Sequence, residues 1–257
     1  MSSLPHSTTR IGGVPIAVTS LAAATASVLA LRESKPVRLV NAYSLVAGRQ
    51  NREYGDVLRG AGLNLPDGAP VVVAMRAVAR SRSAGRVRGP SLFTELLRQG
   101  CREGKSFYFL GGDATTLSRV TRRAALDFPG LSIAGEYSPP FQPLDESFVE
   151  LCREAVLSCE AKPDVVLVAL GTPKQDILGL RLTELTGITT VAVGAAFGFY
   201  AGTVREAPVW MRRVGLEWAF RLITEPRRLW KRYIIGNMIF VALAGRSIVK
   251  AWVSGNG

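Results

Sequence analysis

The stretch DVVLVALGTPKQ, at residues 164–175, contains the pattern that decides the fold. Six apolar residues follow Asp164, a Gly-Thr-Pro turn ends the run, and a helical pattern begins at Gln175. An uninterrupted apolar strand followed by a helix is typical of a parallel sheet that is covered on both faces. The stretch therefore predicts one strand–helix unit of an α/β fold.

The same alternation of strands and helices extends outward from this unit. Strands are predicted over residues 13–18, 37–40, 62–65, 106–110, 131–136, 164–170 and 189–193. Helices are predicted over residues 20–32, 44–60, 69–80, 92–103, 115–127, 144–160 and 175–185. Because buried strands alternate with helices, we expect an α/β fold with a Rossmann-like, mostly parallel sheet and helices on both faces.

The last fifth of the chain differs in composition from the rest. Residues 205–257 carry ten Lys and Arg against three Glu, and they contain all four tryptophans. From Pro208 to Tyr233, Trp, Leu and Phe alternate with Arg at helical spacing, with a break at Pro226. This spacing is typical of amphipathic helices at a membrane interface. We predict an α/β domain over residues 1–203 and a basic, membrane-associating helical appendage over residues 204–257.

The formal charge of +12 implies an acidic partner: nucleic acid, an anionic membrane or a phosphorylated substrate. The apolar stretch 234–244 has eleven residues before Arg246, fewer than the roughly 20 that a spanning helix needs. We therefore expect this stretch to lie in a membrane interface. Two alternatives stay open for the appendage: a basic helix packed on the core, or an arm that binds nucleic acid.

The cysteines and the single histidine form no metal-binding pattern. Cys101, Cys152 and Cys159 contain no CxxC pair, and His6 stands close to the N-terminus. We expect no bound metal and no histidine base. An odd number of cysteines without a disulfide framework is typical of the reducing cytoplasm, so we expect a cytoplasmic protein.

Four predicted strand ends carry turn-forming residues, and such ends meet at one edge of a parallel sheet. The turns are Pro66-Asp67-Gly68, Gly111-Gly112-Asp113, Gly171-Thr172-Pro173-Lys174-Gln175 and Gly194-Ala195-Ala196. Glycine lets the backbone approach a phosphate, and the helix that follows presents free N–H groups. The sequence has no Walker A pattern and no GxGxxG after a strand. We therefore predict a nucleotide site that is neither a P-loop nor a dinucleotide fingerprint.

Asp67 is the carboxylate of greatest interest at this edge. It is either a turn or N-cap residue before the next helix, or a general base that takes a proton from an acceptor hydroxyl. Asp113 is expected to cap the helix that follows it. Asp176 and Glu217 are further candidates, but neither stands at a strand end.

Arginines are dense in the region that follows Asp67. They are Arg76, Arg80, Arg82, Arg86, Arg88, Arg98 and Arg102. The guanidinium fork matches phosphate oxygens, although a solvated basic face is the simpler interpretation for any one of them. We select Arg86, in a glycine-flanked loop, as the expected phosphate ligand.

Two sets of motifs carry a resemblance to a known family. The most specific are Ala207-Pro208-x-Trp210, Gly215-Leu216-Glu217-Trp218-x-x-Arg221-Leu222, Glu225-Pro226-x-Arg228 and Arg232-Tyr233. The others are Asn41, Pro66-Asp67-Gly68, Arg86-Val87-x-Gly89, Gly111-Gly112 and Gly171-x-Pro173-Lys174-Gln175. On these motifs, from about Gly12 to Tyr233, the sequence resembles the WecG/TagA/CpsF glycosyltransferases (glycosyltransferase family 26), which act in cell-surface polysaccharide and wall teichoic acid assembly.

The resemblance implies transfer of a sugar from a UDP-sugar to a polyprenyl-diphosphate-linked saccharide, with inversion and without a metal or other cofactor. It implies that Asp67 is the catalytic base. The expected substrate-binding residues are Asn41, Gly68, Arg86, Gly111, Gly112, Gly171, Thr172, Pro173, Lys174, Gln175 and Gly194. The appendage is expected to dock on the inner face of the cell membrane, where Arg221, Arg228, Lys231 and Arg232 would meet the acceptor diphosphate or the lipid surface.

The expected partners are thus the UDP-sugar, the lipid-linked saccharide and the membrane, with no nucleic acid; a homo-oligomer is compatible with the sequence. Two rival functions stay open: a basic binding protein without catalysis, and a soluble enzyme that modifies nucleotide sugars. The chain also departs from the family pattern at several positions. Leu39 replaces a Thr, Gly89-Pro90-Ser91-Leu92 replaces Gly-Thr-Asp-Leu, Gly198 replaces an Asp, Asp176 replaces a Glu, and Glu206 replaces an Arg.

Overall fold

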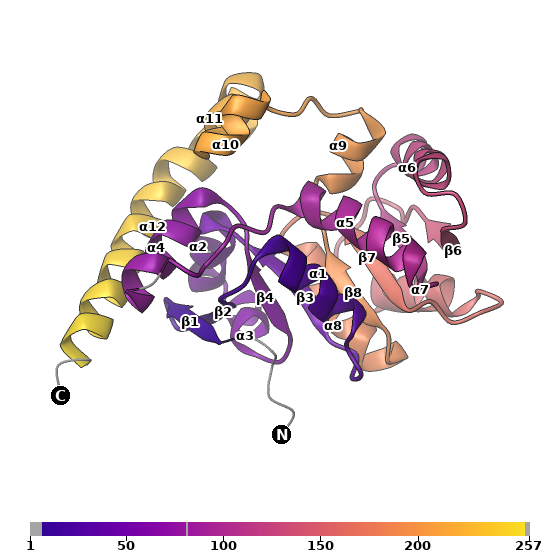
Figure 1. The fold of residues 1–257 in the computed structure, drawn as a ribbon, viewed down its shortest axis with the longest axis horizontal. Helices are drawn as coiled ribbons and strands as arrows, with labels where there is room; N and C mark the ends of the chain where they lie inside the picture. Colours follow the sequence, from indigo (N-terminus) through magenta and orange to yellow (C-terminus); the bar gives the residue numbers. More distant parts are fainter. Residues whose placement is uncertain (1–6, 81, 255–257) are drawn as a thin grey trace.

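The computed structural model describes residues 7–80 and 82–254, apart from the side chains of residues 213, 228 and 231–233. His6 lies outside this range. A six-stranded parallel sheet with the strand order β4-β3-β8-β7-β5-β6 forms the centre of the molecule (Figure 1). Its strands are β3 (Pro36–Val40), β4 (Leu63–Pro66), β5 (Ser106–Gly111), β6 (Ser132–Tyr137), β7 (Val165–Ala169) and β8 (Thr189–Ala192). The parallel sheet confirms the predicted fold class.

Helices cover both faces of this sheet, as the uninterrupted apolar strands predict. On one face, Val165 and Leu167 of β7 belong to a core cluster with α1 (Leu21–Leu29), α5 (Gly89–Arg102), α6 (Ala114–Asp127) and α9 (Ala196–Ala201). On the other face, Val166 and Val168 pack with α7 (Glu146–Leu157) and α8 (Lys174–Thr186). Alternate residues of one strand therefore supply two separate cores.

A third core lies beside β3 and β4. It contains residues of α2 (Ala42–Gln50), α3 (Arg52–Arg59), α4 (Ala69–Ala79) and a two-stranded antiparallel sheet of β1 (Thr8–Ile11) and β2 (Val14–Ala17). The sequence predicted β2 but missed β1 and α9, which are both short. The single helix predicted over residues 44–60 is wrong. The chain breaks at Asn51, whose side chain accepts a hydrogen bond from the backbone N–H of Tyr54 and so begins α3.

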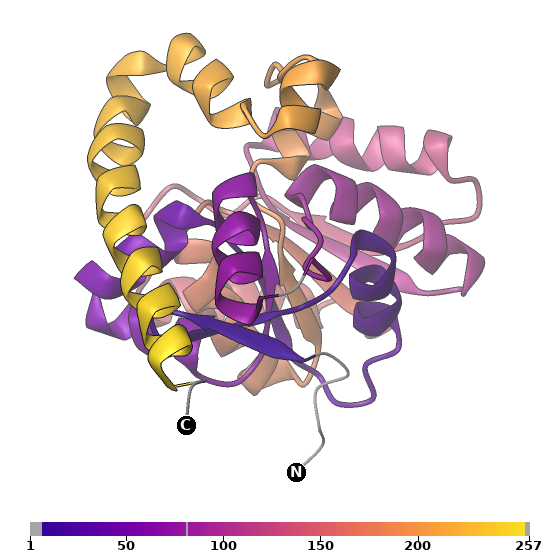
Figure 2. The ribbon, with the colours of Figure 1, turned by 60° about the vertical axis from the view of Figure 1, so that its left-hand side comes forward.

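The C-terminal part forms α10 (Val209–Val214), α11 (Glu217–Thr224) and the long α12 (Pro226–Ser254). Pro226 is the first residue of α12, which confirms the break predicted there. Figure 2 shows α12 running down the flank of the molecule past the β1–β2 sheet. Phe240 and Ala244 are buried in the third core, and the indole N–H of Trp252 donates to the carbonyl of Ala77 at 3.2 Å.

The prediction that the apolar stretch 234–244 is too short to span a membrane is wrong, because the apolar helix that contains it is longer than the stretch. The helix continues through Arg246 and Lys250, and Ile234–Ser254 is long and apolar enough to cross a membrane by length and composition alone. The buried positions of Phe240 and Ala244 show that one face of this helix is already used for packing on the core. The division of the chain into domains at residues 203 and 204 stays a prediction.

Candidate active site

A cavity of about 1260 Å³ lies at the carboxyl ends of the central strands. Residues that follow β3, β4, β5, β7 and β8 line it together with the C-terminal part of the chain. The predicted site residues among the lining are Asn41, Asp67, Gly112, Gly171, Thr172, Gln175, Gly194 and Arg221. The structure therefore brings the four predicted turns to a single crevice, as expected for an open parallel sheet.

Asp67 is fixed in this crevice by the backbone on both sides of its turn. Its N–H donates to the carbonyl of Val40 at 2.9 Å, and the carbonyl of Pro66 accepts from the N–H of Val87 at 2.8 Å. Gly68, with φ of +86°, is the N-cap of α4, and no side chain caps that helix. The N-cap interpretation of Asp67 is thus wrong, because its carboxylate lines the cavity instead.

The surroundings of Asp67 favour a proton acceptor. Burial raises the pKa of this carboxyl above its ordinary value and the charge of Glu217 raises it further, while Arg86, Arg88 and a hydrogen bond from Asn41 oppose the rise. A carboxylate with a raised pKa holds a proton more strongly and is a better base. Burial, helped by the charge of Glu217, therefore moves Asp67 toward general-base chemistry against the opposing effect of the two arginines.

Asp113 shows the opposite behaviour at the same edge. It is the N-cap of α6 and accepts hydrogen bonds from the backbone N–H and the hydroxyl of Thr116, at 2.9 and 2.6 Å. These hydrogen bonds lower the pKa of Asp113. The capping role predicted for Asp113 is confirmed. Two carboxylates with pKa values moved in opposite directions point to different roles, and only Asp67 has the environment of a base.

Gln175 connects two of the turns. Its side chain is buried, and its Oε1 accepts from the N–H of Gly171 at 3.0 Å. Its amide nitrogen also lies 3.5 Å from the point where a side chain at Gly194 would begin. Gln175 thus closes the turn after β7 by a hydrogen bond and packs beside the turn after β8 at the wall of the cavity.

Not every glycine of the turns is available to a phosphate. The N–H of Gly112 donates to the carbonyl of Ala169 at 3.0 Å, and the N–H of Gly171 is taken by Gln175. A side chain at Gly111 would meet the carbonyl oxygen of Ala169 at 2.5 Å, and Gly111 does not line the cavity. At Gly111 the sheet itself requires glycine, because the backbone of the neighbouring strand comes too close for a Cβ atom.

The turn after β7 divides between the cavity and the interior. Thr172 lines the cavity, whereas Pro173 and Lys174 do not. The ammonium of Lys174 donates to the carbonyl of Gln142 at 2.6 Å and lies 3.5 Å from the centre of the Phe148 ring. The structure therefore directs Lys174 away from the phosphate role that the sequence predicted.

Of the arginines that follow Asp67, Arg88 rather than Arg86 lines the cavity. Arg86 stands behind it and donates to the carbonyl of Arg212 at 2.8 Å. The sequence analysis grouped Arg88 with its neighbours and did not select it. The two residues share the loop before α5, and no local pattern in the sequence distinguishes Arg88 from its neighbours.

The C-terminal part contributes three charges that the sequence analysis did not assign to the site: Arg205, Glu206 and Glu225 line the cavity. The predicted Arg221 and the further candidate Glu217 line it as well. The Nε of Arg221 is buried and makes no hydrogen bond within the described residues. The side chains of Arg228, Lys231 and Arg232 lie outside the described part of the structure, so their predicted roles stay predictions.

Comparison with known proteins identifies this arrangement. The model of the WecG/TagA/CpsF glycosyltransferase family matches residues 9–253. The chain belongs to this family. The family match runs through both the strand-end cavity and the C-terminal helices, so the enzyme is a glycosyltransferase whose cavity is built from both parts.

Two curated relatives share the printed name N-acetylglucosaminyldiphosphoundecaprenol N-acetyl-beta-D-mannosaminyltransferase. The protein from Bacillus spizizenii (strain ATCC 23059 / NRRL B-14472 / W23) is 34% identical over 187 residues, which cover 72% of this chain and 69% of the relative. The protein from Bacillus subtilis (strain 168) is 33% identical over 199 residues, which cover 77% of this chain and 74% of the relative.

Proposed function

We propose that this glycosyltransferase moves a sugar from a UDP-sugar to a saccharide linked to polyprenyl diphosphate, with inversion at the anomeric carbon, in the assembly of a cell-surface polysaccharide. The observation that carries the proposal is the position of Asp67, in a cavity lined by strand-end turns and by arginines from the C-terminal part. The relatives' names, which pair a diphosphoundecaprenol-linked acceptor with a mannosaminyl group, support the class of acceptor and an N-acetylhexosamine as the transferred sugar.

In the proposed mechanism Asp67 takes the proton of the acceptor hydroxyl as the oxygen attacks the anomeric carbon. The bond from that carbon to the nucleotide diphosphate breaks, and the diphosphate leaves with the electron pair. An α-linked donor then gives a β-linked product, which agrees with the relatives' names. Arg88 and Arg221 would stabilise the negative charge of the leaving diphosphate. The proposal includes no metal ion and no cofactor.

We also place the enzyme on the inner face of the membrane through its C-terminal helices. Their exposed apolar residues include Trp210, Trp218, Ile223, Trp230, Ile234, Met238 and Val241. Ile235 and Ile239 of α12 line the cavity, so the apolar surface continues into the site. Such a surface fits a lipid-linked acceptor and the tryptophan-rich interface of a bilayer.

The experiment that tests the proposed function is a transfer assay. The full-length enzyme is mixed with a panel of UDP-sugars and a polyprenyl-diphosphate-linked N-acetylglucosamine, and products are detected by mass spectrometry. We expect the acceptor to gain the mass of one N-acetylhexosamine residue with release of UDP. Absence of any sugar transfer across the panel would overturn the proposed donor and acceptor.

Membrane binding is tested separately by sedimentation with vesicles that contain anionic lipid. Met238→Asp, on the exposed face of α12, should weaken the binding because a charge replaces an exposed apolar side chain that would enter the bilayer. Leu126→Asp, at an equally exposed apolar residue on α6, is the matched control and should bind like the wild type. Equal effects of the two variants would contradict docking through α12.

A further inference from the structure

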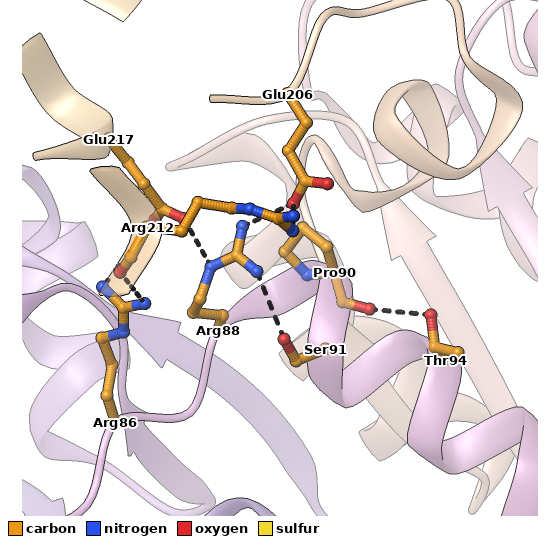
Figure 3. A network of polar contacts seen from close by, with 8 residues as sticks. All are labelled: Arg86, Arg88, Pro90, Ser91, Thr94, Glu206, Arg212 and Glu217. Carbon is orange, nitrogen blue, oxygen red and sulfur yellow. Dashed lines mark hydrogen bonds and ion pairs between the residues drawn. The ribbon is translucent and has the colours of Figure 1, made fainter. Parts of the chain in front are cut away.

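An ion-pair network closes one side of the cavity (Figure 3). Nη2 of Arg88 lies 2.7 Å from Oε1 of Glu206, and Nε of Arg88 lies 2.6 Å from Oε1 of Glu217. Its Nη1 donates to the hydroxyl of Ser91 at 3.3 Å. The side chain of Arg88 is 13% exposed. The one arginine of its loop that lines the cavity is therefore held by two carboxylates.

Two further arginines complete the network. Arg212 places Nη1 2.8 Å from the same oxygen of Glu206, and Nη1 of Arg86 lies 3.9 Å from Oε2 of Glu217. Arg86, Arg88, Glu206, Arg212 and Glu217 are called the clamp below. The clamp joins the loop before α5 to residues more than 100 positions later, so it fastens the C-terminal part over the cavity.

The charges of the closed cavity do not suit the substrate. Among its described lining residues, five acids stand against three arginines: Asp67, Asp113, Glu206, Glu217 and Glu225 against Arg88, Arg205 and Arg221. A diphosphate brings further negative charge, and like charges at short range repel. Without the two clamp carboxylates the count would be three acids against three arginines. Diphosphate binding is therefore favoured when Glu206 and Glu217 are displaced from the arginines.

The contacts of Arg88 are suited to such an exchange. A guanidinium recognises carboxylate and phosphate oxygens by the same fork of N–H groups. The contact between Nε of Arg88 and Glu217 is close, but the atoms are not aligned for a hydrogen bond. Part of the clamp thus depends on charge alone, and a phosphate oxygen can replace it without the loss of a well-formed hydrogen bond.

We propose that Arg88, supported by Arg86, binds a diphosphate ligand. In the closed enzyme the carboxylates of Glu206 and Glu217 pair with Arg88 instead, and the diphosphate displaces them. The inference rests on the proposed function for the identity of the ligand. The diphosphate can come from the nucleotide donor or from the lipid-linked acceptor, and the two sources share the chemistry that Arg88 recognises.

The test is a double-mutant cycle of ligand binding, measured by calorimetry on the full-length protein at fixed ionic strength. The probes are inorganic pyrophosphate, UDP and geranyl diphosphate. Glu206→Gln and Glu217→Gln each remove a competing charge, so we expect pyrophosphate to bind about three- to tenfold more tightly to each. Glu95→Gln, which removes the ion-pair partner of Arg98 on α5 outside the cavity, is the control and should leave binding unchanged.

Arg88→Gln decides between exchange and simple relief of repulsion. In the Arg88→Gln protein, Glu206→Gln should no longer tighten pyrophosphate binding, because the guanidinium for which Glu206 and pyrophosphate compete is gone. Equal tightening with and without Arg88 would overturn the proposal, as would unchanged or weaker pyrophosphate binding in both glutamate variants, or no pyrophosphate binding to any form. Thermal unfolding shows which variants are folded, and the two glutamate variants give independent readings.

The UDP and geranyl diphosphate arms assign the source of the diphosphate. The probe whose affinity rises in Glu206→Gln identifies whether Arg88 serves the donor or the acceptor. The outcome is separable from the proposed function. Tighter pyrophosphate binding without sugar transfer would uphold the exchange and contradict the function, whereas transfer with unchanged binding would do the reverse.

Discussion

The edge of the central sheet and the C-terminal part of the chain hold their polar residues in different ways. At the sheet edge, partners lie three or four positions apart: Asp113 with Thr116, and Gln175 with Gly171. Across the cavity, Arg88 meets Glu206 at a separation of 118 residues. Short-range hydrogen bonds form with the turn itself, whereas the long-range ion pairs depend on how two parts of the chain dock. The first region therefore takes its geometry from its own turn, and the second is the one that the proposed diphosphate exchange would rearrange.

The sharpest test of the sheet edge is Asp67→Asn. Loss of the base should lower kcat by about 10²–10⁴-fold with the fold intact, as removal of general-base catalysis does. Asp113→Asn is the matched control, because asparagine also caps a helix, and it should change kcat only slightly. The measurement is steady-state transfer with circular dichroism of both variants. Wild-type activity in Asp67→Asn would remove Asp67 from the role of base.

The packing of the C-terminal part is tested by Phe240→Ala. Phe240 is 4% exposed in the third core, so its truncation should lower the free energy of unfolding by about 3–5 kcal/mol. Met238→Ala, two positions away at 71% exposed, should change it by less than about 0.5 kcal/mol. Urea unfolding without lipid measures both. Similar effects would mean that α12 does not pack on the core in solution.

The start of α8 offers a second carboxylate to compare with Asp67. Asp176 is buried, accepts a hydrogen bond from the hydroxyl of Tyr54 at 2.7 Å, and its burial raises the pKa to about 6. The folded protein thus prefers its protonated form, so its contribution to stability is fully present below pH 4 and is lost as the pH rises through 6. In Asp176→Asn we expect that loss to disappear.

The stability of Asp176→Asn relative to the wild type should therefore rise by roughly 1–3 kcal/mol between pH 4 and pH 7. Denaturant unfolding across this range measures the difference. Asp164→Asn is the opposite control, because burial raises the pKa of Asp164 but hydrogen bonds from Ser106 and the charge of Lys105 together lower it below its ordinary value. That variant should instead lose relative stability as the pH rises. If the difference in unfolding free energy between Asp176→Asn and the wild type does not change with pH, the raised pKa of Asp176 is contradicted.

The smallest effect expected is on the pH dependence of kcat/KM. Glu217 raises the pKa of Asp67, and no other carboxylate among its strongest influences does so, while Arg86 and Arg88 lower it. Activity needs Asp67 deprotonated, so it falls as the pH drops through this pKa. Glu217→Gln should move the acidic limb of kcat/KM to lower pH, and Glu95→Gln should leave it in place. A shift to higher pH would contradict the coupling.

Much of the site could be predicted because its signals are local. Apolar runs followed by glycine turns indicate strand ends, and parallel strands bring these ends to one edge whatever the details of packing. Asp113 could be recognised as a cap from its position alone. The role of Asp67 could not, since an Asp before Gly serves equally well in a turn, and only the cap at Gly68 leaves its carboxylate free for the cavity.

The amino-acid sequence by itself determined the parallel α/β sheet, its edge of glycine turns and the break at Pro226, because each depends on residue order within one strand, turn or helix. Only the tertiary structure decided that Arg88 faces the cavity, that Lys174 turns away from it and that Glu206 and Glu217 close it. Those facts depend on contacts between distant parts of the chain, whose geometry no local pattern specifies. The physical reason is that a side chain's direction and charge partners depend on how distant parts of the chain dock, whereas a strand, turn or helix depends on residues close together in the sequence.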